Sequence, residues 1–436
     1  MSEKLRDSVW DRHGVVKRML QDVALPRMVR VRQKLDEERI GSIAATVKAE
    51  LSRPEIAATV KPGASIAITC GSRGIANIAE ITREIVGNLK NLGAKPFIIP
   101  AMGSHGGGNA EGQQQLLASL GVTEETVGAP VRSSMEVVQI GTLEDGRPVA
   151  VDRFASEADG IIVVGRVKPH TAYRGPYESG LFKMLAIGLG KHKGAEACHD
   201  QGFSRMAENV PAFARAMLKN ADVLFGIAVI ENAHDETCKI VALEKDRIEA
   251  DEPALLDEAR ARMAQIYIPK IDVMIVDEIG KNHSGDGMDP NVTGSYSTRY
   301  ASGDPQVEHY VVLDISDPSH GNAVGLGRAD YTTKRVFDKA DFDSTYPNAL
   351  TAKVALVAKV PMVLATDKLA IQAAIKTCSE IGPEGVRVVR IRNSAHVDEI
   401  FVSDNLIPEV KSHPDMEILD PPAEMTFDNE DNLVRN

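Results

Sequence analysis

Two histidines follow predicted strands, where a side chain can act on a bound substrate. His105 lies in GSHGGG, directly after an apolar run at residues 95–100, and His170 follows the run DGIIVVGRVKP. Ligands of open α/β sheets bind beyond the carboxyl ends of the strands. Because imidazole titrates near neutral pH, two such histidines can remove a proton on one side of a substrate and return it on the other. A polar loop histidine and a buried, backbone-bonded histidine are the simpler alternatives for His105 and His170 respectively.

A second group of chemically useful residues lies just after His170. Lys183 has apolar neighbours in GLFKMLAIG, and a desolvated amine can attach a cofactor or a substrate. The alternative is a lysine whose amine reaches water from an amphipathic helix. His192, Glu196 and His199 are spaced i, i+4 and i+7, so a helix places them on one face, as a metal site needs. Lys191 and Lys193 flank this face, so an exposed polar surface is the competing interpretation.

Arg73, in CGSRG, follows a third apolar run. Its guanidinium offers a planar fork of donors that can hold a carboxylate or a phosphate, although a turn arginine on the surface is the alternative.

The elements that position these residues alternate between strand and helix. Short apolar runs at residues 64–70, 95–100, 161–165 and 223–230 predict buried strands, and helices are expected near 78–92 and 110–120. This order is typical of a parallel sheet. Residues 135–152 predict a hairpin around Glu-Asp-Gly.

A new strand–helix series begins at residue 271, with strands expected at 271–276, 310–315 and 386–391 and a helix at 350–360. Residues 1–60 look helical and charged. We therefore expect an α/β protein of two domains with mainly parallel sheets: an N-terminal cofactor-binding domain (1–268) and a C-terminal α/β domain (269–436). The cofactor and substrate site is expected in the interdomain cleft.

The composition of the chain disfavours two classes of binding partner, nucleic acids and anionic membranes. The 436 residues carry a net charge of −12, with 43% hydrophobic, 26% charged and only 4% aromatic residues. An acidic chain poor in aromatic residues does not suit nucleic acid or an anionic membrane as the main partner. The N-terminus lacks an apolar signal core, no run reaches the ~18 apolar residues of a membrane span, and the four cysteines form no CxxC pair. We expect a cytoplasmic protein that acts on a small molecule; the sequence does not give its oligomeric state.

The ordered set of Arg73, His105, Pro169-His170, Lys183 and His199 resembles the nickel-dependent lactate racemase family. That family carries a strand-end arginine, a Gly-Thr-His loop, a Pro-His pair, a lysine and a histidine sixteen residues after the lysine. Here the interval from 183 to 199 is also 16 residues. The resemblance covers most of the N-terminal domain and continues more weakly into the second.

The resemblance implies a role for each matched residue. Lys183 anchors a nickel-pincer nucleotide, a pyridinium-3,5-bisthiocarboxylic acid mononucleotide made by separate cofactor-synthesis proteins, and a covalent bond is one form this attachment takes. His199 is the protein ligand to nickel. His105 and His170 are the acid/base pair, and Arg73 holds the substrate carboxylate. The implied activity is a 2-hydroxy acid racemase or epimerase, an isomerase that inverts C2 by proton-coupled hydride transfer to the cofactor.

The sequence also departs from this family. The family has an aspartate three residues before the turn arginine, where this chain has Cys70. The interval from His170 to Lys183 is longer, with an inserted YRGPYESG segment, and polar residues from the family's second domain have no clear counterpart in NVTGSYSTR. These changes predict a substrate larger or more polar than lactate, such as a sugar acid, with the insertion as the main source of the difference. A zinc or iron hydrolase or hydro-lyase using His192, Glu196 and His199 stays open, as does a non-catalytic protein that binds a nucleotide or sugar acid.

Overall fold

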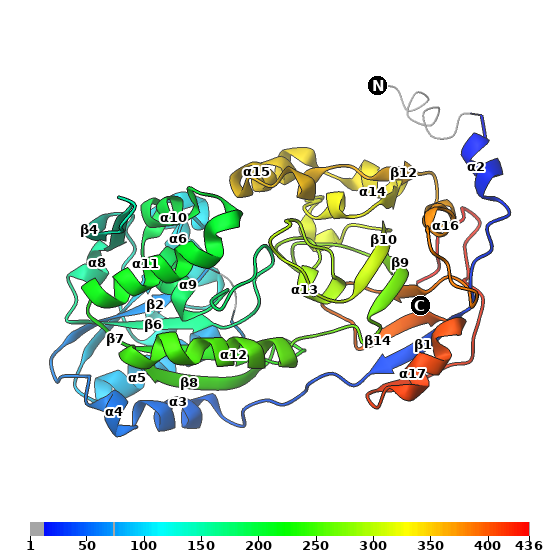
Figure 1. The fold of residues 1–436 in the computed structure, drawn as a ribbon. Helices are drawn as coiled ribbons and strands as arrows, with labels where there is room; N and C mark the ends of the chain where they lie inside the picture. Colours follow the sequence, from blue (N-terminus) through cyan, green and yellow to red (C-terminus); the bar gives the residue numbers. More distant parts are fainter. Residues whose placement is uncertain (1–12, 73–74, 436) are drawn as a thin grey trace. The chain divides into compact units, whose positions relative to one another are not determined.

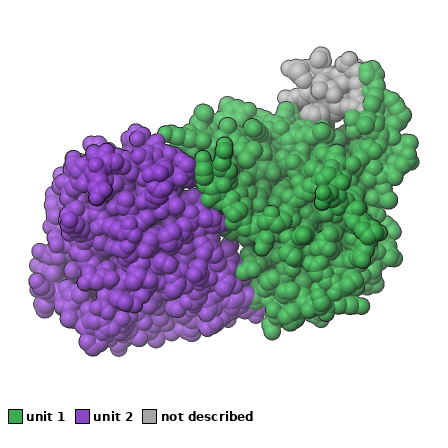
Figure 2. All heavy atoms as spheres, viewed as in Figure 1, with its two compact units in different colours: residues 1–35, 264–436 green, residues 36–263 purple. Residues whose placement is uncertain are grey.

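The computed structural model describes residues 13–72 and 75–435. The chain forms two compact units (Figure 2): unit 1 comprises Met1–Leu35 and Ala264–Asn436, and unit 2 comprises Asp36–Met263. The chain thus passes from unit 1 into unit 2 and then back into unit 1. The expected first domain, 1–268, included residues 1–35, whose strand β1 (Met28–Gln33) instead pairs into the sheet of unit 1.

Unit 2 is built on a mainly parallel sheet flanked by helices (Figure 1), as its strand–helix alternation predicted. In spatial order its strands are β3 (Lys95–Pro100), β2 (Ser65–Cys70), β6 (Gly160–Arg166), β7 (Val223–Glu231) and β8 (Thr237–Glu244). The first four run parallel, and β8 is antiparallel to β7. Since β3 and β6 lie on opposite sides of β2, the strand order reverses there, which is where ligands of such sheets bind.

The two faces of this sheet bury separate apolar cores. In β2, Ile66 and Ile68 point into one core and Ala67 into the other, as strand alternation requires. Helices α3 (Ile43–Leu51), α5 (Ile78–Asn91) and α6 (Ala110–Ser119) supply the first core, while α11 (Met206–Asn220) and α12 (Ile248–Arg262) supply the second. The predicted hairpin is confirmed as β4 (Val137–Thr142) and β5 (Pro148–Asp152), followed by the short helix α8 (Arg153–Ser156).

The segment that carries Lys183 and His199 is a bent helix. It begins with α9 (Leu181–Lys183), continues as a π-helical turn (Met184–Gly188) and, after a bend, becomes α10 (Lys191–His199). The bend falls at Lys191, whose φ of +52° lies in the left-handed region. Lys183 and His199 therefore lie on two arms of different direction.

Unit 1 contains a mixed eight-stranded sheet. Its spatial order is β12 (Met362–Leu364), β11 (Tyr331–Thr333), β10 (Gln306–Val312), β9 (Lys270–Val276), β13 (Val388–Ile391), β14 (Glu399–Ser403), β1 and β15 (Met416–Ile418). The five strands from β12 to β13 are parallel, and the rest are antiparallel. Helices α2 (Val15–Leu20), α13 (Pro290–Thr293), α14 (Lys334–Lys339), α16 (Asp367–Thr377) and α17 (Ile407–Ser412) complete the unit together with α15.

The helix expected at 350–360 lies earlier in the chain, as α15 (Phe342–Ala352). Asp341 starts it by accepting hydrogen bonds from the backbone N–H groups of Asp343 and Ser344, and Lys353 ends it in the left-handed conformation. The rest of the expected helix contains only a 3₁₀ turn, Ala355–Ala358. The expectation missed the aspartate that begins the helix.

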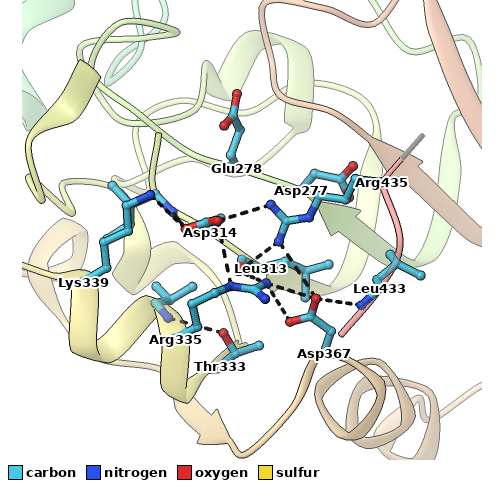
Figure 3. A network of polar contacts seen from close by, with 12 residues as sticks. Asp277, Glu278, Leu313, Asp314, Thr333, Arg335, Lys339, Asp367, Leu433 and Arg435 are labelled. Carbon is cyan, nitrogen blue, oxygen red and sulfur yellow. Dashed lines mark hydrogen bonds and ion pairs between the residues drawn. The ribbon is translucent and has the colours of Figure 1, made fainter. Parts of the chain in front are cut away.

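A network of charged residues lies at the carboxyl ends of β10 and β12 in unit 1 (Figure 3). Arg335 lies 2.9 Å from the fully buried carboxylate of Asp367, which also accepts a hydrogen bond of 3.0 Å from the N–H of Leu433. Arg435 reaches Asp314, which follows β10, at 3.3 Å. The network therefore attaches the C-terminal segment to the sheet. None of the helices in the described part of the chain combines the length and apolar character of a membrane-spanning segment.

Candidate active site

A pocket of about 180 Å³ opens at the carboxyl ends of β2, β3 and β6 in unit 2. Gly71 and Ser72 follow β2, Met102 and His105 follow β3, and Pro169 and His170 follow β6; all of them line it. The bent helix supplies the remaining wall, from Gly180 to Gly188. The sheet thus brings His105, His170 and Lys183 to one cavity.

The pocket is cationic. Arg166, Lys168 and Lys183 line it, and none of the described lining residues is acidic. Arg166 is paired with the nearly buried Glu231 behind it, so its charge is partly compensated. Such a lining favours an anionic ligand.

Arg166 and Lys168 were not among the residues we selected from the sequence, although a signal for them was present. Together with His170 they occupy alternate positions of an extended segment, and alternate side chains of a strand share a face. The bridge between Lys168 and Ser179 keeps this segment extended beyond β6.

His105 lies in the turn between β3 and α6. Its Nδ1 is 2.8 Å from the carbonyl oxygen of Met102, and because a carbonyl only accepts hydrogen bonds, Nδ1 carries the hydrogen. In the neutral ring the lone pair is then on Nε2, which is the arrangement of a proton acceptor. The positive φ values of Gly106, Gly107 and Gly108 shape the turn that follows.

His170 has the opposite arrangement. The backbone N–H of Ala172 donates to its Nδ1 at 3.0 Å, so Nδ1 holds the lone pair and Nε2 carries the hydrogen in the neutral ring. Its ring lies against Tyr173, with centroids 4.5 Å apart. The two histidines of the pocket therefore differ in which nitrogen donates.

Glu178 fixes the backbone of the loop that carries His170. Its fully buried carboxylate accepts hydrogen bonds from the backbone N–H of His170 at 2.7 Å and of Gly175 at 3.2 Å. Arg174, at 3.1 Å, and Arg260, at 2.5 Å, neutralise it. Tyr173 also donates to the Glu178 carbonyl oxygen at 2.9 Å. The inserted segment, which the sequence suggested as a source of substrate preference, thus packs beneath His170.

Glu252 fixes the start of the helix that carries Lys183. This buried carboxylate of α12 accepts a hydrogen bond from the N–H of Phe182 at 2.9 Å and another from Leu181. Burial raises the pKa of Glu252 to about 8, against the lowering effect of the two hydrogen bonds. No side chain at Gly180 would fit, since a Cβ there would lie 2.2 Å from the Glu252 carboxylate.

His199 is placed apart from the pocket lining. Its Nδ1 is 2.7 Å from the carbonyl oxygen of Ala195, so the neutral ring has its lone pair on Nε2, the form that binds a metal. Phe203 lies near both histidines, with its ring centroid 6.3 Å from that of His199 and 6.4 Å from that of His170.

The alternative metal face does not form. His192 and Glu196 are exposed on α10, and no three His, Cys, Asp or Glu side chains within residues 13–72 and 75–435 are grouped as a metal site needs. The described residues therefore give no support to a zinc or iron site formed by His192, Glu196 and His199. The flanking Lys191, read from the sequence as part of an exposed face, is fully buried. Arg73 lies outside the described residues.

Comparisons with known proteins place this pocket in a family context. Residues 15–209, which include every residue that lines the pocket, match the family model of the lactate racemase N-terminal domain. The lactate racemase apoprotein from Thermoanaerobacterium thermosaccharolyticum has a similar structure, with a TM-score of 0.51 and 17% identity over 84% of this chain and 98% of that one. A Thermotoga maritima protein gives a TM-score of 0.47 and 13% identity over 80% of this chain and 86% of that one.

No curated protein matches the sequence. The domain match and the shared α/β fold nevertheless agree with the resemblance drawn from the motif residues. The chain is lactate racemase-like: its residues 15–209 match the lactate racemase N-terminal domain, and it shares the α/β fold of a lactate racemase apoprotein.

Proposed function

We propose that this chain is a racemase or epimerase that inverts C2 of a 2-hydroxy acid. The domain match supports a racemase-type isomerase. The observation that carries the finer proposal is the histidine pair: His105 and His170 line one cationic pocket, with the lone pair on Nε2 of the first and the hydrogen on Nε2 of the second. Inversion needs one group that accepts a proton and one that donates it.

The tautomer of His105 suits the base directly, whereas His170 needs a second proton to act as the acid. In one direction, Nε2 of His105 accepts the proton of the 2-hydroxyl while C2 gives up hydride to the acceptor that a bound cofactor would supply, which leaves a planar 2-keto acid. His170 takes up a second proton at Nδ1 from water, which displaces the contact with the Ala172 N–H, and as an imidazolium it donates its Nε2 proton to the keto oxygen when hydride returns to the other face of C2. Exchange with water then returns both rings to their starting forms, and the reverse direction uses the same two groups with their roles exchanged.

The cations of the pocket orient an acid. We assign the substrate carboxylate to Arg73, as the family resemblance implies, and an additional polar or anionic group of the substrate to Lys168. A bound acid gains both charge neutralisation and a fixed orientation of C2 between the histidines. Lys168, which lines the pocket, supports a substrate more polar than lactate, such as a sugar acid.

The donor chemistry of unit 2 suits a nickel-pincer nucleotide. Lys183 offers an amine on the pocket wall, suited to anchor the cofactor by charge or by a covalent bond, and His199 offers an Nε2 lone pair for nickel. When bound, this group supplies the acceptor that takes hydride from C2 and returns it. We propose that unit 2 is the cofactor-binding part and that cofactor-synthesis proteins load the chain in the cytoplasm.

The test is a screen with loaded protein. Full-length chain is co-expressed with cofactor-synthesis proteins in nickel-containing medium and incubated with single stereoisomers of lactate, malate and gluconate, followed by chiral chromatography. Inversion of at least one acid is expected, with a loss of about 10²- to 10⁴-fold for His105→Gln and for His170→Gln. His192→Gln, an exposed histidine of the same unit, is the matched control and keeps both nickel and activity.

Two outcomes contradict the proposal. Unchanged turnover in both His105→Gln and His170→Gln removes the histidines from the chemistry. Nickel-loaded protein that binds these acids without inverting any of them is a non-catalytic binding protein. Separately, intact-protein mass spectrometry distinguishes the forms of cofactor attachment, because a covalent adduct is absent from Lys183→Ala.

A further inference from the structure

Lys191, at the bend of the helix that carries Lys183 and His199, is a fully buried cation. Its Nζ lies 2.9 Å from Oδ2 of Asp152, and neither side chain is exposed to solvent. Burial lowers the pKa of the Lys191 ammonium, and the Asp152 carboxylate opposes that shift. A buried pair of this kind is a weak source of stability, so its value lies in what it holds in place.

The backbone at Lys191 adds to this argument. A φ of +52° disfavours a residue with a Cβ by about 1 kcal/mol or more, and glycine is the residue best suited to it. The position nevertheless holds a long cationic side chain. The contacts of its ammonium group therefore offset both the backbone strain and the burial of charge.

Those contacts lead to the turn that carries His105. Besides its ion pair with Asp152, the Nζ group donates to the carbonyl oxygen of Pro100, the last residue of β3, and to Oε1 of Gln113 at 3.4 Å. Gln113, in α6, is itself fully buried. The ammonium of Lys191 thus joins the bent helix to the strand before His105 and to the helix after it.

Gln113 continues the connection into the turn itself. Its Nε2 donates to the carbonyl oxygen of Gly103 at 2.9 Å and to that of His105 at 3.2 Å. Because the amide oxygen faces the ammonium of Lys191, the amide nitrogen must face the turn. Lys191 therefore fixes which end of the Gln113 side chain meets the backbone around His105.

We propose that Lys191 and Gln113 are positioning residues that hold the His105 turn, and with it the Nδ1–H tautomer that leaves Nε2 as the proton acceptor. The inference rests on the proposed function, which makes His105 an acid/base residue. Gln113 fixes the carbonyl groups on both sides of residue 104, and the same turn places the Met102 carbonyl 2.8 Å from Nδ1 of His105. An imidazole outside this turn samples both tautomers.

The test reads the tautomer directly, in full-length protein and without any substrate. The histidines are labelled with ¹⁵N, and the His105 signals are assigned by their absence in His105→Gln. In the unsubstituted protein, the Nδ1 resonance is expected at the position of a protonated ring nitrogen and Nε2 at that of an unprotonated one. In Gln113→Met the two resonances move toward each other, and Gln115→Met, on the exposed side of the same helix, leaves them unchanged.

Two internal controls separate positioning from misfolding. The His170 signals keep the opposite pattern in Gln113→Met, because its Nδ1 contact with Ala172 lies in another loop. Gln113→Asn, which keeps an amide but shortens its reach, shifts the His105 signals in the same direction. An Nδ1–H signature of His105 that persists in either folded variant overturns the proposal, as does an Nε2–H signature in the unsubstituted protein.

The kinetic readout keeps this inference distinct from the proposed function. With an acid that the loaded protein inverts, Gln113→Met lowers kcat by less than His105→Gln does, while KM changes little. Changed ¹⁵N signals without any turnover leave the positioning role intact and contradict only the racemase proposal. Unchanged signals with normal turnover contradict only the positioning role.

Discussion

Glu252 makes the stability of unit 2 depend on pH in a calculable direction. Burial raises its pKa from 4.5 to about 8 in the folded protein. Between these values the folded protein keeps the proton that the unfolded chain loses, so raising the pH favours unfolding. The contribution of this group to the free energy of unfolding is fully present below pH 4.5 and is lost as the pH rises through about 8.

The size of the effect follows from the same two pKa values. One pKa unit corresponds to about 1.36 kcal/mol, so the full loss is on the order of 5 kcal/mol as an upper bound. Glu252→Gln keeps the shape of the side chain and an oxygen that accepts from Phe182, but it cannot ionise. The variant is therefore expected to lose much less stability than the unsubstituted protein between pH 5 and pH 8.

The assay is urea unfolding followed by circular dichroism at several pH values, with hydrogen exchange of the peptide spanning residues 181–190 as the local readout. Glu249→Gln is the matched control, because Glu249 lies on the same helix with a partly exposed side chain paired to Arg215. Its pH dependence should follow that of the unsubstituted protein. If Glu252→Gln also follows it across pH 5 to 8, the reasoning about burial of Glu252 is refuted.

Two further predictions concern the contacts that join the His105 turn to the bent helix. Lys191→Met should lower the free energy of unfolding by about 3–5 kcal/mol, because it leaves the Asp152 carboxylate buried without its cation. The double variant Lys191→Met with Asp152→Asn should regain most of that free energy. Urea unfolding measures both, and losses that simply add for the two single variants would contradict the pairing. Gly188→Ala should destabilise by about 1–3 kcal/mol, since a Cβ there would lie 2.7 Å from the Ala101 carbonyl oxygen. Gly87→Ala is its control, because Gly87 is a helical glycine with open space around it, and equal stability of the two variants would contradict the close approach.

The meeting of His105 and His170 could be predicted because it depends on strand ends. Each histidine follows an apolar run, and the parallel pairing of β3 and β6 with β2 brings those ends to one edge of the sheet. The apolar runs of the sequence alone locate these strand ends, so the placement of the two histidines could be predicted without a structure.

The burial of several charged residues could not be predicted from the apolar pattern. Glu178, Lys191 and Glu252 have polar neighbours or helical surroundings in the sequence, where charged residues are normally exposed. Their burial depends on partners far along the chain, such as Arg260 for Glu178 and Asp152 for Lys191. No local pattern indicates these pairs.

The strand β1 was missed for a related reason, although a local signal existed. The buried Val29 and Val31 alternate with the exposed Arg30 and Arg32, which is the period of a strand. Helical character was instead assigned to residues 1–60 as a whole. Its antiparallel partner β14 lies near the other end of the chain, so the sequence around β1 gives no hint of the pairing.

The central claim is that C2 is inverted when hydride leaves it and returns to its other face, while two histidines move the hydroxyl proton. Isotopic labelling tests this claim most directly. An acid that the loaded protein inverts is supplied with deuterium at C2 in ordinary water, and the product of opposite configuration is analysed by mass spectrometry. Hydride that leaves C2 and returns to it does not mix with solvent protons, so the account predicts that the inverted product retains deuterium at C2. Replacement of that deuterium by solvent hydrogen during inversion would show that C2 loses a proton instead, and would contradict the account.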